Sequence, residues 1–481
     1  MREAVGHGLE VKTRTGFLAE GIIWRYPAIG IAATLFATFV AVNLIPERPQ
    51  PEGALFWPAL VLSAGLLVAP IAAAFRQAKA LLRAEHLLVI APIYWLLLDL
   101  LQGAYSMDGI SVIEIEEAFI SIGIFVCCVW IGSMARPWRL PLFIKDIVSK
   151  DLHSSVYFYL AVVSFLLGIS RFAVATNFNV IAMFQSIGGG RWDAPWARGQ
   201  LGGWDAFLDH LQYFGYLTGV LTVVVGRGVG WRNWRTLVSA LMSTVMALFL
   251  VQGGSRRVIG VVVGMALIFW VLVQDRGLKV KHAVGIALTV IALLFAMQFM
   301  LQYRNVGLTV ALSDPAVEQQ ELSPNEYLHV DDNFYRLCQV IQLIPNTHPY
   351  VYHGYLVYAV VRPIPRVLWP GKPVDAGFDL TRAVGDREVS YSCSVIGELY
   401  MSLGLLGIAL GGWLYGRLAA LVNGVLSQST ALGGVVIYSI GAMALFSGMR
   451  SMLELVLVSY VLIAWVVLSR LFAARFRKRV A

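Results

Sequence analysis

The chain is a succession of long apolar runs separated by short polar stretches. Runs at residues 32–45, 55–75, 87–105 and 118–135 are nearly free of charged side chains. A helix needs roughly 20 such residues to cross the ~30 Å hydrocarbon core of a bilayer. Helices are expected because backbone polar groups in lipid must find partners within their own segment. The pattern therefore predicts an all-α, polytopic integral membrane protein.

We expect about twelve membrane-spanning helices, in one polytopic domain that covers residues 1–481. No cleavage site follows the first run, so we expect that run to stay as an anchor. The composition agrees with this fold class, since 58% of the residues are hydrophobic and only 14% are charged. The expected spans are residues 27–45, 55–75, 87–105, 118–135, 153–173, 208–226, 236–252, 258–274, 283–302, 394–416, 431–449 and 452–472.

Lysine and arginine gather in alternate loops and in both tails. The basic loops cover residues 76–83, 136–150, 227–235 and 276–281, and the chain ends in RFRKRVA. Because basic loops stay in the cytoplasm, we expect both termini there. The net charge of +8 mostly reflects this topology, so it does not indicate nucleic-acid binding.

The longest polar interruption covers residues 302–391, a large loop on the outer side between the ninth and tenth expected spans. Within it, DDNFYRLCQVIQLIP has apolar residues at helical spacing, which predicts a short amphipathic helix on the outer surface. RPIPRVLWPGKP is a stiff extended loop, because each proline fixes its own backbone angle and restricts the residue before it. Cys338 and Cys393 both fall on this side, and whether they form a disulfide stays open.

Several cationic side chains lie at the outer membrane boundary, where charge is costly unless it serves a site or finds a partner. The planar guanidinium group matches phosphate oxygens, so the group as a whole predicts a site for a polyanion. Any single member is also explained by snorkelling to lipid headgroups, or by pairing with Glu398, Asp331, Asp332 or Asp379. The members are Arg171, Arg256, Arg257, Arg304, Arg336, Arg362, Arg366, Lys372 and Arg450.

The order of motifs across residues 250–415 carries a family resemblance. GGSRR is followed by YRN, then by DDNFYRL, IPRVLWPGKP and SVIGELYMSLGLLG. This order resembles the Wzy-type oligosaccharide repeat-unit polymerases, which make O-antigen and exopolysaccharide. The resemblance implies a multi-pass enzyme of the bacterial inner membrane, with its active site at the periplasmic face. Its substrate would be an undecaprenyl-pyrophosphate-linked oligosaccharide, and a chain-length regulator protein is a further expected partner.

Glycosyl transfer from a lipid pyrophosphate needs a base near the acceptor hydroxyl and positive charge at the leaving diphosphate. Guanidinium groups can supply that charge, so we expect no metal and no cofactor. The candidate bases are Glu398, His353 and Asp332. The candidate phosphate ligands are Arg256, Arg257, Arg304, Arg366 and Arg450. The candidate substrate contacts are Arg336, Arg362, Lys372, Trp369 and Tyr400.

Two other functions fit the same outward charges. A ligase of the O-antigen type would share the phosphate site but transfer a finished glycan to a different acceptor. A transporter or flippase for a lipid-linked glycan would use the charges to line a path, and it would favour charges at mid-membrane and broken helices. The unusual residues crowd one face of the membrane, which favours chemistry there.

Overall fold

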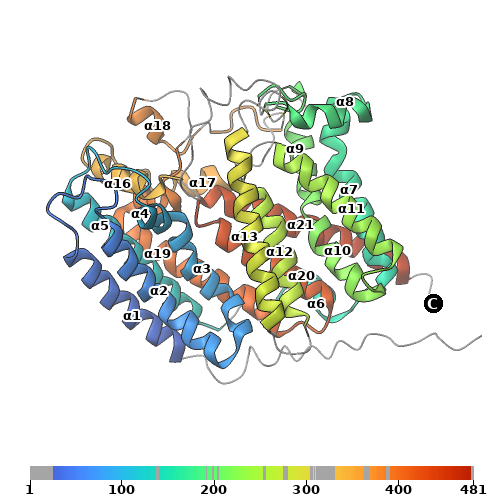
Figure 1. The fold of residues 1–481 in the computed structure, drawn as a ribbon, viewed down its shortest axis with the longest axis horizontal. Coiled ribbons are helices and arrows are strands. Elements are labelled where there is room, and N and C mark those ends of the chain that lie inside the picture. The colour runs from blue at the N-terminus through green and yellow to red at the C-terminus, as the bar shows by residue number, and fades with distance from the viewer. Residues whose placement is uncertain are drawn as a thin grey trace, which may run out of the picture.

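The computed structural model describes residues 25–136, 140–190, 192–197, 200–202, 205–252, 256–274, 280–303, 307, 309, 331–361, 364, 368–373, 375–385 and 391–477. All regular structure in these residues is helical (Figure 1). The elements of the first half are α1 (Arg25–Asn43), α2 (Phe56–Arg76), η2 (Ala78–Leu82), α3 (Ala84–Pro92), η3 (Ile93–Leu97), α4 (Leu98–Gln102), α5 (Val112–Ser133), α6 (Leu142–Ser149), α7 (Ser154–Ala175), α8 (Val180–Gln185), η4 (Ser186–Gly188), α9 (Asp205–Gly215) and α10 (Leu217–Val229). Those of the second half are α11 (Trp234–Gln252), α12 (Arg256–Leu272), α13 (Val280–Tyr303), α16 (Asn333–Leu343), α17 (Gly354–Val361), α18 (Leu380–Ala383), α19 (Ser394–Ser427), α20 (Leu432–Ser447) and α21 (Met452–Arg477).

Seven of the described helices are long and apolar enough to cross a membrane. Three shorter apolar helices accompany them, so the chain has the make-up of a polytopic α-helical membrane protein. The count of twelve spans stays a prediction. The seven are Tyr26–Asn43, Phe56–Arg76, Ala84–Gln102, Ser154–Ala175, Trp234–Gln252, Ser394–Ser427 and Met452–Ala473, and the shorter ones are Val258–Leu272, Val284–Ala296 and Leu432–Ser447.

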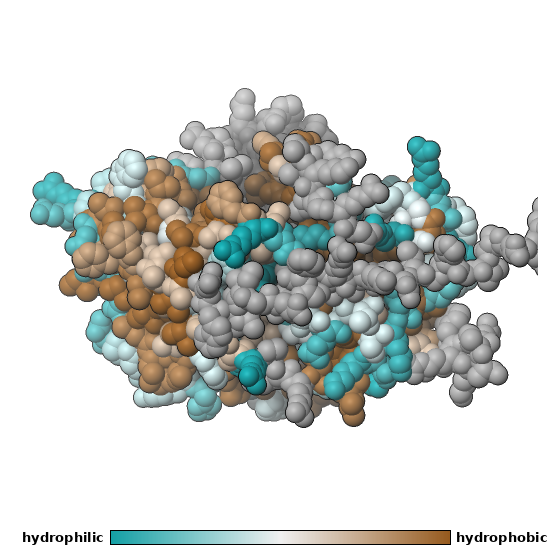
Figure 2. All heavy atoms as spheres, turned by 90° about the horizontal axis from the view of Figure 1, so that it is seen from below, coloured by the Kyte–Doolittle hydropathy of each residue, from teal (hydrophilic) through white to brown (hydrophobic). Residues whose placement is uncertain are grey.

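The outer surface of the bundle is apolar where a membrane protein meets lipid. Phe36 and Phe39 of α1 are 70% and 68% exposed, and Phe75 of α2 is 88% exposed. Seen from below, apolar side chains gather on the side of the molecule where α1 and α2 lie in Figure 1 (Figure 2). A soluble monomer rarely exposes an apolar surface of this extent.

Helices α5 and α19 cross with their backbones close together, and glycines make this possible. A Cβ atom added at Gly416 would lie 2.2 Å from the carbonyl oxygen of Val129. One added at Gly132 would lie 2.2 Å from the carbonyl oxygen of Trp413. Gly412 and Gly416 form a small-xxx-small pair, which is how membrane helices bring their backbones together. The crossing fixes α19, which carries one of the candidate bases.

The described loops meet in two groups, one at each end of the bundle. At one end, the amide of Met107 donates to the carbonyl of Gln50, and the hydroxyl of Tyr335 donates to the carbonyl of Asp108. At the opposite end, the Lys79 ammonium group donates to the carbonyl of Leu272. These two groups are the ones that the lysine and arginine pattern separates. Which end faces the cytoplasm stays a prediction.

Candidate functional site

A group of ionisable and hydroxyl side chains lies where α16 and α17 meet the N-terminal ends of α19 and α21. We call it the polar cluster. Its elements α4, α16 and α17 lie together in the upper left part of Figure 1. The members come from residues 99 to 451, so only the fold brings them together. They are Asp99, Asp331, Asp332, Arg336, Tyr355, Glu398, Arg450 and Ser451.

Glu398 lies one turn into α19 and is only 3% exposed. Its Oε1 atom accepts hydrogen bonds from the hydroxyls of Tyr355 and Ser451, each at 2.6 Å. Its Oε2 atom accepts the backbone N–H of Met452 at 2.6 Å. Met452 is the first residue of α21, whose first-turn N–H groups have no partner within the helix. The Glu398 carboxylate therefore closes the N-terminus of α21 and ties it to α17 and α19.

Arg450 precedes α21 and pairs with an acid of the long loop. Its Nε atom lies 2.8 Å from Oδ2 of Asp331. Burial alone would lower the pKa of the Arg450 guanidinium, but Asp331 raises this pKa above its ordinary value, and Glu454 and Glu398 act in the same direction. Arg450 is thus held as a cation among several carboxylates. In turn, the backbone N–H of Asp331 donates to Oδ2 of Asp99 at 3.0 Å.

A second ion pair joins Asp332 to Arg336 across one turn of helix. Oδ2 of Asp332 lies 2.7 Å from Nη2 of Arg336, and Nη1 of Arg336 donates to Gln339 at 2.8 Å. The guanidinium group also stacks over the ring of Tyr391, 3.4 Å from its centroid. Burial raises the pKa of the Asp332 carboxyl, and the Arg336 charge partly offsets this. At least three of the five N–H donors of Arg336 are therefore used within the protein.

The backbone around the polar cluster departs from regular helix. Pro92 is followed by a π-helical turn, Ile93–Leu97, and Asp99 comes two residues later. In α19, Leu403 and Gly404 have non-helical backbone angles. Asp332 has a φ of +41°, a left-handed conformation that is uncommon outside glycine. Irregular backbone of this kind concentrates at functional sites in helical proteins.

The fold brings together only some of the predicted site residues. Glu398, Asp332, Arg336 and Arg450 all lie in the polar cluster. His353 is exposed just before α17. Three candidates point elsewhere: Trp369 is 41% exposed, Lys372 donates to the carbonyl of Ile364 at 2.7 Å, and the Tyr400 hydroxyl donates to Glu117 at 2.8 Å.

The remaining predictions fall on residues that the structure does not describe. Arg304, Arg362 and Arg366 lie outside the described residues. Arg256 and Arg257 begin α12, but their side chains are also outside the description. Their roles as phosphate or substrate ligands stay predictions.

The structure bears on two expectations about the long loop. The helix expected in DDNFYRLCQVIQLIP is present as α16, and its polar face is partly exposed at Tyr335 and Gln342. Phe334, Leu337 and Cys338 are fully buried, because the helix packs its apolar face between α5 and α19. Cys338 and Cys393 are both buried and are free thiols.

Arg171 shows the structural role that any single arginine can have. It is 5% exposed, and Nη2 and Nη1 lie 2.8 and 2.6 Å from the carboxylates of Asp205 and Asp209. Its Nη2 also donates to the carbonyl of Trp196 at 3.0 Å. Arg171 therefore braces α7 against α9 and has little capacity left for a ligand.

Sequence reasoning missed three members of the polar cluster. The sequence does single out Asp99, because it is an acid inside the apolar run LLLDLLQ, and ionisable residues in such runs are rarely without function. Tyr355 and Ser451 had none beyond their positions in HPYVYHGYLVY and GMRS. Their role depends on the fold that brings α17, α19 and α21 together.

One family model matches part of the chain. A family model described as a domain of unknown function (DUF8712) matches residues 333–475. The matched segment runs from the start of α16 into α21 and so contains Glu398 and Arg450. No curated protein and no solved structure matches the chain.

Proposed function

We propose that the chain is a membrane-embedded glycosyltransferase that joins undecaprenyl-pyrophosphate-linked oligosaccharide repeat units. In this proposal the polar cluster faces the periplasm of a bacterial inner membrane and both termini face the cytoplasm. The donor is a growing glycan on a lipid diphosphate. The acceptor is the terminal sugar of another lipid-linked repeat unit.

The observation that carries the proposal is the convergence of three separated motifs. DDNFYRL, GELY and GMRS lie far apart in the sequence, yet the Arg450–Asp331 pair and the Glu398–Ser451 hydrogen bond join all three. Two of them, DDNFYRL and the GELY of SVIGELYMSLGLLG, are motifs on which the resemblance to repeat-unit polymerases rests. Ionisable groups in a membrane bundle are costly to bury, so a cluster of them at one end of the bundle indicates a functional site.

The chemistry of the polar cluster suits transfer of a sugar from a diphosphate. Guanidinium groups stabilise the charge that develops on the leaving group, and carboxylates can accept the proton of an attacking hydroxyl. Arginine keeps its charge when it is partly buried, which an amine does not. In the proposal these groups act without a nucleotide sugar and without a metal ion.

The test is a reconstitution of the purified protein in liposomes. Undecaprenyl-pyrophosphate-linked repeat units are the only substrate, with no nucleotide sugar, ATP or divalent metal added. A ladder of longer lipid-linked glycans is the expected product. A product that forms only when a second acceptor lipid is added would identify a ligase instead, and movement of the lipid between leaflets without a change in its mass would identify a transporter.

One observation favours the transporter as the second candidate. The apolar segment Ala84–Gln102 is interrupted by a π-helical turn and contains the buried acid Asp99, and α19 is interrupted at Leu403 and Gly404. Broken helices with a buried charge are typical of transporters. Both interruptions adjoin the polar cluster, so they also suit a site for chemistry at one end of the bundle.

A further inference from the structure

Asp99 is a buried acid of the polar cluster that has no cationic partner. It lies in α4, within the apolar segment Ala84–Gln102, and is 3% exposed. Its Oδ2 atom accepts the backbone N–H of Asp331 at 3.0 Å, but its Oδ1 atom is buried and has no hydrogen-bond partner. Among the residues that the structure describes, no lysine, arginine or histidine forms an ion pair with it. An ionised carboxylate here would be an unpaired buried charge, which is costly.

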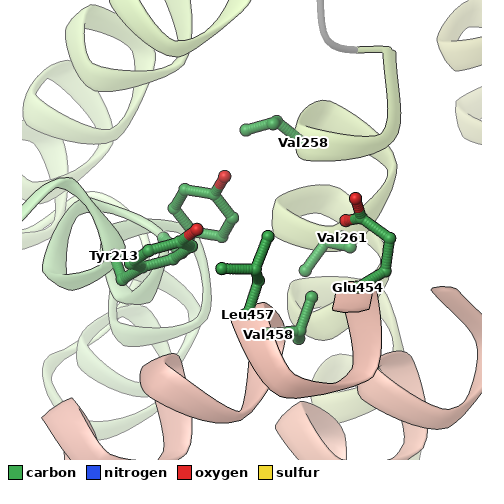
Figure 3. Close-up of a pocket in the computed structure, with 7 residues that line it drawn as sticks. Tyr213, Val258, Val261, Glu454, Leu457 and Val458 are labelled. Atoms are coloured by element: carbon green, nitrogen blue, oxygen red, sulfur yellow. The ribbon is translucent and has the colours of Figure 1, made fainter. Parts of the chain in front are cut away.

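Two other buried acids at this end of the bundle are compensated, which sets Asp99 apart. The Glu398 carboxylate accepts three hydrogen bonds. Glu454 acts on a nearby cation, because its charge contributes to the raised pKa of Arg450. Glu454 also borders a cavity of about 20 Å³, room for one water-sized group, with Tyr213 on the opposite side (Figure 3).

The charges that act on Asp99 are those of Asp331 and Asp332, and both are negative. Each of these two acids already has an arginine, since Asp331 pairs with Arg450 and Asp332 with Arg336. This part of the cluster therefore sets three carboxyl groups against two guanidinium groups. Ionising Asp99 would leave one negative charge without a partner.

The neutral neighbours supply no donor for the unpartnered oxygen either. Tyr105 interacts electrostatically with this acid, and its hydroxyl is buried without a partner. A phenol titrates near pH ~10, so Tyr105 is neutral at physiological pH. The side-chain amide of Asn333 donates to the carbonyl of Trp95 and to Oδ2 of Asp331. Of the helices packed against α4, η3 has no charged residue, and α2 has only Arg76, at its opposite end.

We propose that Asp99 is a proton-binding site, with a neutral carboxyl group in the folded protein near neutral pH. A proton on Oδ1 removes the charge and leaves Oδ2 free to accept the N–H of Asp331. Because Asp331 also pairs with Arg450, losing the proton would place a negative charge beside the ion pair that joins the start of α16 to α21. The polar cluster therefore contains a pH-sensitive site. This inference does not rest on the proposed function.

The first experiment compares Asp99→Asn with Asp331→Asn in the unfolding of the full-length protein in mixed detergent micelles. Asparagine has the shape of a neutral carboxyl group and keeps an oxygen that can accept the N–H of Asp331. Asp99→Asn should change the unfolding equilibrium constant by less than about threefold near neutral pH. Asp331→Asn should raise it by at least about tenfold, because it leaves the Arg450 charge unpaired. If Asp99→Asn does not fold, or is destabilised as much as Asp331→Asn, the inference is overturned.

The second experiment follows the same equilibrium between about pH 5 and about pH 7. An aspartate titrates near pH ~4 in an unfolded chain, so folding should take up one proton at Asp99 in this range. The folded state then binds more protons than the unfolded state, and stability falls as the pH rises. The wild-type unfolding constant, relative to that of Asp99→Asn, should rise about tenfold per pH unit until the folded protein releases the proton. Parallel pH profiles for the two proteins would contradict the inference.

An infrared difference spectrum reads the protonation state directly. Wild type minus Asp99→Asn should show the C=O stretching band of a protonated carboxylic acid near neutral pH, and a carboxylate band in its place would refute the inference. So would a stabilisation by sodium over potassium, at equal ionic strength, that the wild type shows and Asp99→Asn does not, because it would identify a bound metal ion. None of these measurements depends on the glycan ladder, so a wild-type protein that makes no ladder counts against the proposed function alone.

Discussion

Replacing Glu398 by alanine should destabilise the protein, because this carboxylate is the shared acceptor for three elements. The change removes the partner of the Tyr355 hydroxyl, the Ser451 hydroxyl and the Met452 N–H, which lie 2.6 Å from its oxygens. A buried donor left without an acceptor costs about 1–3 kcal/mol. Three such donors give an upper range of about 3–9 kcal/mol, and water that enters the vacated space should reduce it to about 3–5 kcal/mol.

Glutamine at position 398 should be milder, for a geometric reason. The amide can place its oxygen toward the Met452 N–H and its NH2 group toward the two hydroxyls, which can rotate and accept. The hydroxyl protons then lose their acceptor, so we expect a loss of about 1–2 kcal/mol. The order of stability should therefore be wild type, Glu398→Gln, Glu398→Ala.

The assay is the free energy of unfolding in mixed detergent micelles, with Glu52→Ala as the matched control. Glu52 is an exposed acid in the loop before α2, so its removal should change the free energy by less than about 0.5 kcal/mol. If Glu398→Ala unfolds like this control, the structural role of Glu398 is refuted. Wild-type stability combined with a lost ladder in Glu398→Gln would refute it as well, and would make Glu398 the base of the proposed transfer.

Two further predictions concern the ion pair and the helix crossing. Arg450→Asp should reduce the yield of folded protein, because it places a carboxylate opposite Asp331. Adding Asp331→Arg should restore part of that yield. Equal yields for the single and the double variant would contradict the pairing. Gly416→Ala should destabilise the bundle by about 1–3 kcal/mol, since the added Cβ atom would meet the carbonyl oxygen of Val129. The control is Gly285→Ala on α13, where an added Cβ atom meets no atom within 4 Å and should leave the stability unchanged. Equal melting temperatures for these two variants would contradict the close crossing.

The helices could be located from the sequence, because a long apolar run in lipid has to form a helix to satisfy its own backbone N–H and C=O groups. The expected spans at 55–75 and 236–252 correspond to α2 at Phe56–Arg76 and α11 at Trp234–Gln252. Interruptions were missed, because they arise from contacts between helices. Within the π-helical turn of the third expected span, the carbonyl of Trp95 accepts from Asn333, a partner that hydropathy cannot reveal.

The polar cluster could be predicted only where its partners are close in the sequence. Asp332 and Arg336 are four residues apart, and this spacing places them on one face of a helix. Arg450 and Asp331 are 119 residues apart, so no local pattern selects Asp331 over another acid.

The ion pairs also limit which arginines can hold a diphosphate in the proposed reaction. Arg450 is committed to Asp331, and Arg336 to Asp332 and the Tyr391 ring, so a phosphate group would have to displace a carboxylate to reach either. Exchanging one anion for another gains little. Within the proposed function, Arg450 and Arg336 therefore hold the acids of the polar cluster in place, and their positive charge acts on the leaving diphosphate without direct contact.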